Sequence, residues 1–137
     1  MTKPLSLNEI RSRAAAFVVD WRDSPGDERQ DAQSFVRALL AVYGITENRA
    51  ALYEKRAQRT STGQQGYIDA LVPGTLVIEM KSAGKNLGLA EIQALDYMGD
   101  IPEIEQPRYV LTSDFRKLRL LDITAPKGED VTEWAIE

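Results

Sequence analysis

Cysteine and histidine are both absent from this 137-residue chain. Without cysteine there is neither a disulfide nor a thiolate metal site, and a reducing, cytoplasmic location is the simpler interpretation. Without histidine the chain has no imidazole base, no histidine-bound zinc and no Ser-His-Asp triad. Any hydrolytic chemistry would therefore depend on carboxylates, lysine, tyrosine or a hard metal ion.

Long apolar runs and an excess of positive charge are missing as well. No apolar run approaches the ~18 residues that span a bilayer, and the N-terminus lacks the apolar core of a signal peptide, so we expect no membrane partner. The formal net charge is −4, which argues against strong autonomous binding to nucleic acid. The content of 43% hydrophobic and 28% charged residues is typical of a globular protein, and the length fits one domain.

Helical periodicity dominates the first third of the chain. The segment SLNEIRSRAAAFVVDW begins with Ser6 and Glu9 in the relation of a capping box, which predicts the start of a helix. The second helical segment, DERQDAQSFVRALLAVYG, ends at Gly44. Each segment has one apolar face, formed by Ile10, Ala14, Phe17 and Trp21 in the first and by Ala32, Phe35, Val36, Leu39 and Tyr43 in the second. Both are predicted helices that pack on the core.

Strand-like patterns follow. ALYEKRAQ, YIDALV and TLVIEMK are predicted strands, and PRYVLTSDFRKLRLLDIT is a predicted hairpin that turns at SDFRK. Between them, LAEIQALDYMGDI is a predicted helix with a broad apolar band of Leu89, Ile92, Leu95 and Met98. The order indicates an α/β fold, an α+β sandwich with a mixed sheet of about five strands flanked by helices. We assign residues 1–124 to this domain and expect the acidic residues 125–137 to form a linker, or a strand with its partner elsewhere.

Two charges interrupt the apolar strand TLVIEMK. Glu79 and Lys81 are two residues apart and therefore point to the same face of the strand. Val77 shares this face and makes it partly apolar, so a solvated surface explains the charges poorly. A Glu–Lys pair at a sheet edge is the alternative, and it accounts for these two residues taken alone.

Asp69 supplies a second carboxylate, ten positions before Glu79. A three-residue loop over residues 73–75 would place the two side chains opposite each other, whereas a two-residue loop would turn Asp69 to the other face. Two carboxylates about 5 Å apart repel by roughly 3 kcal/mol at an effective dielectric of about 20, and a divalent cation removes that penalty. All-oxygen ligation favours Mg²⁺, with Mn²⁺ as a substitute. With Lys81 alongside to orient water, the pattern predicts metal-assisted hydrolysis of a phosphodiester.

The run from Asp69 to Glu79-Met80-Lys81 resembles the PD-(D/E)XK nuclease motif, with Ile68 in place of the proline. The resemblance implies a restriction-endonuclease-like core. In such a core Asp69, Glu79 and the backbone carbonyl of Met80 would bind the metal. Lys81 would be the catalytic lysine.

Further residues follow from the same resemblance. Gln93 and Tyr97 match the QxxxY element of several such nucleases and share a helix flank, from which they could face the phosphate or the attacking water. A polar shoulder on an amphipathic helix explains this pair equally well. Glu28 or Gln33 from the second helix could also reach the site, although a solvated helix face explains Glu28 equally well.

Several separated blocks, in the same order, are similar to the N-terminal nuclease domain of MmeI-like restriction-modification enzymes of type IIG/IIL. They run from SLNEIRSRAAAFVVDW through GYIDALVPGTLVIEMKSAGK to PRYVLTSDFRKLRLLD. The same domain begins DNA methyltransferases of related phage-defence systems. The resemblance implies a Mg²⁺-dependent DNA endonuclease, with methyltransferase and target-recognition modules as partners in cis or in trans. S-adenosylmethionine would be a cofactor only where a methyltransferase module is attached.

DNA contacts would come from the basic residues near this site. The candidates for contacts with DNA phosphates are Lys55, Arg56, Arg59 and Lys85. Simple solubilising charge explains each of them equally well, and no segment resembles a base-reading element. Transient dimerisation on DNA is a hypothesis, because cleavage of both strands usually takes two copies. The main alternative function is a catalytically inactive nuclease fold with a structural or regulatory role in a DNA methyltransferase; another is an enzyme that cuts branched or single-stranded DNA.

Overall fold

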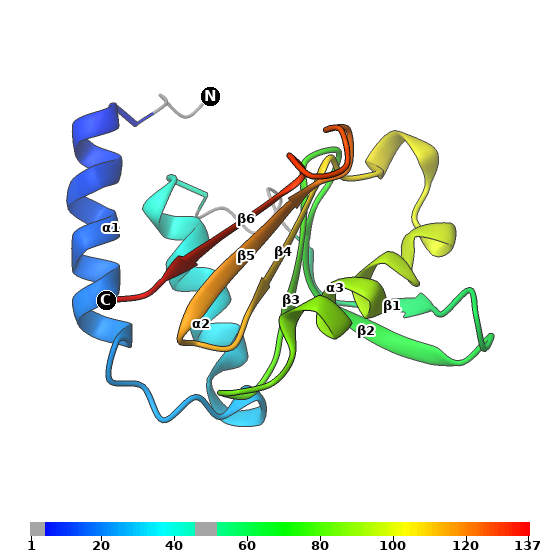
Figure 1. The fold of residues 1–137 in the computed structure, drawn as a ribbon, viewed down its shortest axis with the longest axis horizontal. Coiled ribbons are helices and arrows are strands. Elements are labelled where there is room, and N and C mark those ends of the chain that lie inside the picture. Colours follow the sequence, from blue (N-terminus) through cyan, green and yellow to red (C-terminus); the bar gives the residue numbers. More distant parts are fainter. Residues whose placement is uncertain (1–4, 46–51) are drawn as a thin grey trace.

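The computed structural model describes residues 5–45 and 52–137, which form three α-helices, two short 3₁₀ turns and six strands (Figure 1). The helices are α1 (Leu7–Trp21), α2 (Glu28–Val42) and α3 (Leu87–Leu95). The strands are β1 (Leu52–Gln58), β2 (Gln65–Val72), β3 (Leu76–Met80), β4 (Tyr109–Ser113), β5 (Lys117–Asp122) and β6 (Val131–Ala135). The turns η1 (Met98–Asp100) and η2 (Glu103–Glu105) follow α3. Ala51, the first residue of the first predicted strand, lies outside the described residues.

The helix starts follow from local capping. The Ser6 hydroxyl accepts a hydrogen bond from the backbone N–H of Glu9 at 3.1 Å and donates one to the Glu9 carboxylate, which confirms Ser6 as the N-cap of α1. Asp27 caps α2 by accepting hydrogen bonds from the backbone N–H groups of Arg29 and Gln30. Both predicted N-terminal helices are therefore confirmed.

The strands form one mixed sheet in the order β1-β2-β3-β4-β5-β6. Neighbouring strands pair antiparallel except for β3 and β4, which run parallel and are connected through α3. Helices cover both faces of the sheet. The predicted mixed sheet flanked by helices is confirmed, with six strands in place of about five.

The additional strand is β6. It pairs antiparallel with β5, from Leu121 opposite Val131 to Lys117 opposite Ala135. Ile136 is buried in the core beside α1 and α2. The predicted boundary at residue 124 is therefore wrong for this segment: residues 131–136 are part of the domain, and the partner of the strand lies within this chain.

The α1–α2 face of the sheet holds an aromatic core. The rings of Phe17, Trp21 and Phe115 all lie near the ring of Phe35, with centroid distances of 5.1 to 5.2 Å. Phe115 belongs to the β4–β5 turn and has a φ of 68°, a conformation that bulky residues rarely adopt. Burial of its ring in this cluster compensates for the strained backbone.

The opposite face is covered by α3, and there the apolar band of this helix does not form the core. The residues of α3 that are buried are Leu87, Ala90 and Ala94. The larger side chains Leu89, Ile92 and Leu95 are exposed, and Met98 lies in η1. Small residues let the helix approach the sheet closely, so the larger ones face outward. None of the helices within residues 5–45 and 52–137 is long and apolar enough to cross a membrane.

Candidate active site

The β2–β3 hairpin brings two carboxylates together. Val72 pairs with Leu76 around the loop 73–75, which confirms the predicted three-residue connection. The ladder continues to Ala70 opposite Ile78, and Asp69 and Glu79 are the next positions in this register. Their side chains therefore lie opposite each other on one face, as the loop length predicted.

Asp69 also ends the regular pairing of the two strands. One of its carboxylate oxygens, Oδ2, accepts a hydrogen bond of 2.7 Å from the backbone N–H of Met80. Burial raises the pKa of Asp69, while this N–H and the charge of Lys81 oppose the rise. The carboxylate is thus fixed by the strand that carries Glu79.

Glu79 is a buried acid, with 5% of its surface exposed. Burial, followed by the negative charge of Asp69, raises the pKa of Glu79 to about 9. Its oxygen Oε2 is buried and receives no N–H or O–H from the described residues, while the neighbouring Asp69 carboxylate could share a proton with Glu79. A buried carboxylate oxygen without a donor is costly, so this atom needs either a proton or a positively charged ligand.

Lys81 follows directly after β3 and is half-buried. Its backbone N–H donates to the carbonyl of Ser113 at 2.8 Å, which continues the parallel pairing with β4. The positive charge of Lys81 acts on both Asp69 and Glu79. The structure therefore brings the three motif residues together.

Helix α2 contacts the same region. Gln33 donates from its side-chain amide to the backbone carbonyl of Asp69 at 3.3 Å. The negative charge of Glu28 raises the pKa of Asp69 and of Glu79, so this carboxylate also lies near the pair. Both predicted accessory residues are thus located beside the site, while their roles stay predictions.

The loop after Lys81 is fixed by contacts that the sequence analysis did not identify. The Ser82 hydroxyl accepts a hydrogen bond from the backbone N–H of Glu28, and Asp114 accepts one from the N–H of Gly84. A hydrogen bond of 3.0 Å joins the N–H of Ala83 to the carbonyl of Gly26, where φ is 73° and a side chain would collide with Ala83. Aspartate directly after a buried strand was the available signal for Asp114.

Tyr97 approaches the carboxylates from the end of α3. Its side chain is buried and its hydroxyl packs against Gly66 of β2. Burial, together with the charge of Glu79, raises the pKa of the Tyr97 hydroxyl, whereas the charge of Arg59 lowers it. The charges of both Glu79 and Arg59 therefore act on the Tyr97 hydroxyl.

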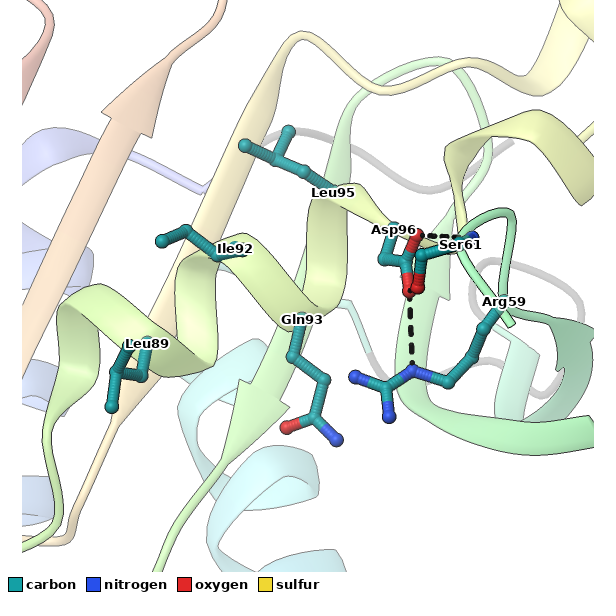
Figure 2. Close-up of a pocket in the computed structure, with 7 residues that line it drawn as sticks. All are labelled: Arg59, Ser61, Leu89, Ile92, Gln93, Leu95 and Asp96. Carbon is teal, nitrogen blue, oxygen red and sulfur yellow. Dashed lines mark hydrogen bonds and ion pairs between the residues drawn. The ribbon is translucent and has the colours of Figure 1, made fainter. Parts of the chain in front are cut away.

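Gln93 belongs to a separate pocket. This pocket has a volume of about 620 Å³ and lies between the loop after β1 and the outer face of α3 (Figure 2). It is lined by Arg59, Ser61, Leu89, Ile92, Gln93, Leu95 and Asp96. Asp69, Glu79 and Lys81 are not part of its lining. Of the two residues of the QxxxY element, Gln93 lines this pocket and Tyr97 is buried against β2.

The four predicted DNA-contacting residues do not form one cluster. Lys55 and Arg56 are neighbours in β1 and therefore point to opposite faces of the strand. Lys85 is exposed in the loop before α3, and Arg59 is half-buried in the pocket. Of the four, the structure holds Arg59 in a defined geometry.

The donor set fits a hard divalent cation. Two carboxylates face each other in a largely buried position, and Glu79 Oε2 has no other partner among the described residues. Oxygen ligands of this kind suit Mg²⁺ or Mn²⁺. Within residues 5–45 and 52–137 no group of three or more Asp, Glu, His or Cys side chains is arranged to hold a metal, so a third ligand from this region would be a backbone carbonyl, another oxygen-bearing side chain or water.

A family model described as the N-terminal domain of MmeI matches residues 12–136. The chain belongs to this family. The match extends from α1 to the end of β6, so both carboxylate strands, α3 and the additional strand lie within the MmeI N-terminal domain. No curated protein and no solved structure matches the chain.

Proposed function

We propose that this MmeI-family domain is a metal-dependent DNA endonuclease that hydrolyses phosphodiester bonds. Family membership associates the chain with restriction-modification enzymes. The observation that carries the proposal is the buried pair of Asp69 and Glu79 beside Lys81, with one carboxylate oxygen lacking a partner among the described atoms. A buried carboxyl pair of this kind costs stability, and a divalent cation would replace the proton that otherwise neutralises it.

Asp69, Glu79 and the backbone carbonyl of Met80 are the proposed ligands of Mg²⁺, for which Mn²⁺ would substitute. When bound, the ion supplies a Lewis acid that polarises a phosphoryl oxygen and makes water more acidic. The cation also offsets the mutual repulsion of the two carboxylates.

The chain's own residues have separate tasks in this proposal. Lys81 carries the positive charge that offsets charge developing on the phosphate, and it orients the attacking water. Tyr97 offers a hydroxyl between the carboxylates and Arg59. Glu28 is an accessory carboxylate that tunes the charge of the pair. S-adenosylmethionine and DNA recognition belong to methyltransferase and target-recognition modules, which are the proposed partners in cis or in trans.

Nicking of supercoiled plasmid DNA by this chain with Mn²⁺ tests the proposal. We expect Lys81→Ala to lower the nicking rate by about 10²–10³-fold, since it removes one electrostatic stabiliser of the transition state. Lys127→Ala, which removes a lysine from the exposed β5–β6 loop, is the matched control and should leave the rate unchanged. Nicking by Lys81→Ala at the rate of the unaltered chain would refute the role of Lys81.

A chain that is folded but nicks nothing with either metal would refute the proposal. In that case the inactive nuclease fold with a structural role in a methyltransferase becomes the better interpretation. Circular dichroism of each variant separates loss of activity from loss of fold.

A further inference from the structure

Asp96 ties the loop after β1 to the end of α3. Its carboxylate accepts hydrogen bonds from the backbone N–H of Ser61 at 2.9 Å and from the Ser61 hydroxyl at 2.7 Å. Its backbone carbonyl accepts a third from the N–H of Thr60 at 2.8 Å. The same carboxylate forms an ion pair with Arg59, at 3.3 Å from Nε. One aspartate therefore fixes both the path of the loop and the side chain of Arg59.

The ion pair with Asp96 is made through Nε of Arg59, which is buried and has no well-aligned hydrogen bond among the described residues. In the part of the chain that the structure describes, no hydrogen bond joins the other two guanidinium nitrogens or the Gln93 side-chain amide to a protein atom. Figure 2 shows both groups pointing to the same side of the pocket. Together they offer several N–H donors and one positive charge to a ligand that enters there.

The donors suit an anion with several oxygens. A guanidinium presents its outer nitrogens as a fork, which matches two phosphate oxygens, and an amide can donate to a third. A pocket of about 620 Å³ also has room for a nucleotide, and its aliphatic side chains Leu89, Ile92 and Leu95 offer an apolar wall beside it.

The position of the pocket relates it to the carboxylate pair. The guanidinium carbon of Arg59 lies 5.8 Å from the centroid of the Tyr97 ring. The Tyr97 hydroxyl packs against Gly66 of β2, the strand that also carries Asp69. Sites on either side of one tyrosine can contact phosphates of the same DNA strand.

We propose that Arg59 and Gln93 bind a phosphate of DNA next to the one that is hydrolysed, and that Asp96 is the positioning residue that aims Arg59 at it. The inference rests on the proposed nuclease function for the identity of the ligand. It assigns to Gln93 a task in substrate binding, separate from the carboxylates, and it adds Asp96 to the site.

Binding of a fluorescein-labelled DNA duplex, measured by anisotropy in Ca²⁺ over a series of salt concentrations, tests the phosphate site. We expect Arg59→Ala to weaken binding about tenfold, because a charged hydrogen-bonded contact is lost. The slope of log K against log salt should fall by about 1. Arg11→Ala, which removes an exposed arginine from α1 on the opposite face, is the matched control and should change neither quantity. An unchanged slope in Arg59→Ala, or no binding by the unaltered chain, would overturn the inference.

Asp96→Asn tests the positioning role through the sign of its effect. The substitution removes a negative charge, so if Asp96 acted only through its charge, DNA would bind more tightly. If Asp96 aims Arg59, binding becomes weaker by about threefold or more, and the effect disappears in the Arg59→Ala background. Ser61→Ala keeps both charges and should weaken binding in the same direction. Tighter binding by Asp96→Asn, in a variant with an unchanged circular dichroism spectrum, would contradict the positioning role.

These outcomes are separate from those of the nuclease proposal, because binding in Ca²⁺ does not depend on cleavage. A chain that binds DNA through Arg59 but nicks nothing would support the phosphate site and refute the nuclease. If the Arg59→Ala variant nicks plasmid DNA as fast as the unaltered chain and binds DNA with an unchanged salt slope, the nuclease is supported and the phosphate site is refuted.

Discussion

The two faces of the sheet differ in the kind of side chains that they bury. On the α1–α2 face, four aromatic side chains fill the space between helices and strands, with Phe35 fully buried at their centre. On the α3 face, the helix contributes small residues to the core, and the sheet carries the buried carboxylate of Glu79. The first face supplies the stability that allows the second to hold a repulsive pair and an open pocket.

The largest loss of stability is expected from truncation of Phe35 on the α1–α2 face. Phe35→Ala removes the ring that contacts Phe17, Trp21 and Phe115, and we expect the free energy of unfolding to fall by about 3–5 kcal/mol. Ile92→Ala on the exposed side of α3 is the control and should cost less than about 0.5 kcal/mol. Urea unfolding measures both. A small effect of Phe35→Ala would show that the aromatic cluster is not the main source of stability.

An intermediate effect is expected where β2 meets Tyr97. A methyl group at Gly66 would collide with the Tyr97 hydroxyl, so Gly66→Ala should lower the free energy of unfolding by about 1–3 kcal/mol. Tyr97→Phe removes the hydroxyl, and in the double variant it should restore part of the loss. Thermal unfolding of the two single variants and the double variant gives the coupling. Strict additivity of the two changes would contradict the predicted contact.

The smallest loss of stability is expected from an ion pair that joins the start of β4 to the end of β5. Hydrogen bonds from Arg108, and then from Thr124, lower the pKa of Asp122 to about 2. Because the pKa of Asp122 is lower in the folded chain than in the unfolded chain, the ionised carboxylate stabilises the fold at pH values above the unfolded pKa. This stabilisation is lost as pH falls from about 4 to about 2. Asp122→Asn should therefore lower Tm slightly at neutral pH and not at all at the acidic end.

The control for this prediction is Asp23→Asn. Its carboxylate lies 3.9 Å from Arg22 in a solvent-exposed pair, and we expect no change in Tm at either pH. If the Tm difference between Asp122→Asn and the unaltered chain grew as pH fell, the pH dependence would be opposite to the prediction. Such a result would contradict the role of the ion pair.

Much of the fold followed from local patterns. Ser6 and the apolar stripe predicted α1, and the parity of the loop 73–75 predicted that Asp69 and Glu79 share a face. Both inferences use geometry that repeats every few residues, so neighbours in the sequence contain the information. The placement of the carboxylate pair could therefore be predicted without the rest of the structure.

Other features depend on contacts that no local pattern contains. Strand β6 is largely exposed from Thr132 to Ala135 and shows no apolar alternation, so it looked like a linker. The outward face of α3 carries larger apolar residues than its buried face, which reverses the usual signal. The ion pair of Arg59 with Asp96 joins residues far apart in the sequence, and only the folded chain brings them together.

The order of the strands in the sheet has a consequence for assembly of the domain. Since β1 to β6 lie side by side in chain order, most strand contacts span short stretches of sequence, which favours rapid folding. Asp69 and Glu79 meet when a single hairpin closes, before either helical layer needs to be in place. Burial of the pair by Tyr97 and α2 removes the water that would otherwise screen the two carboxyl groups.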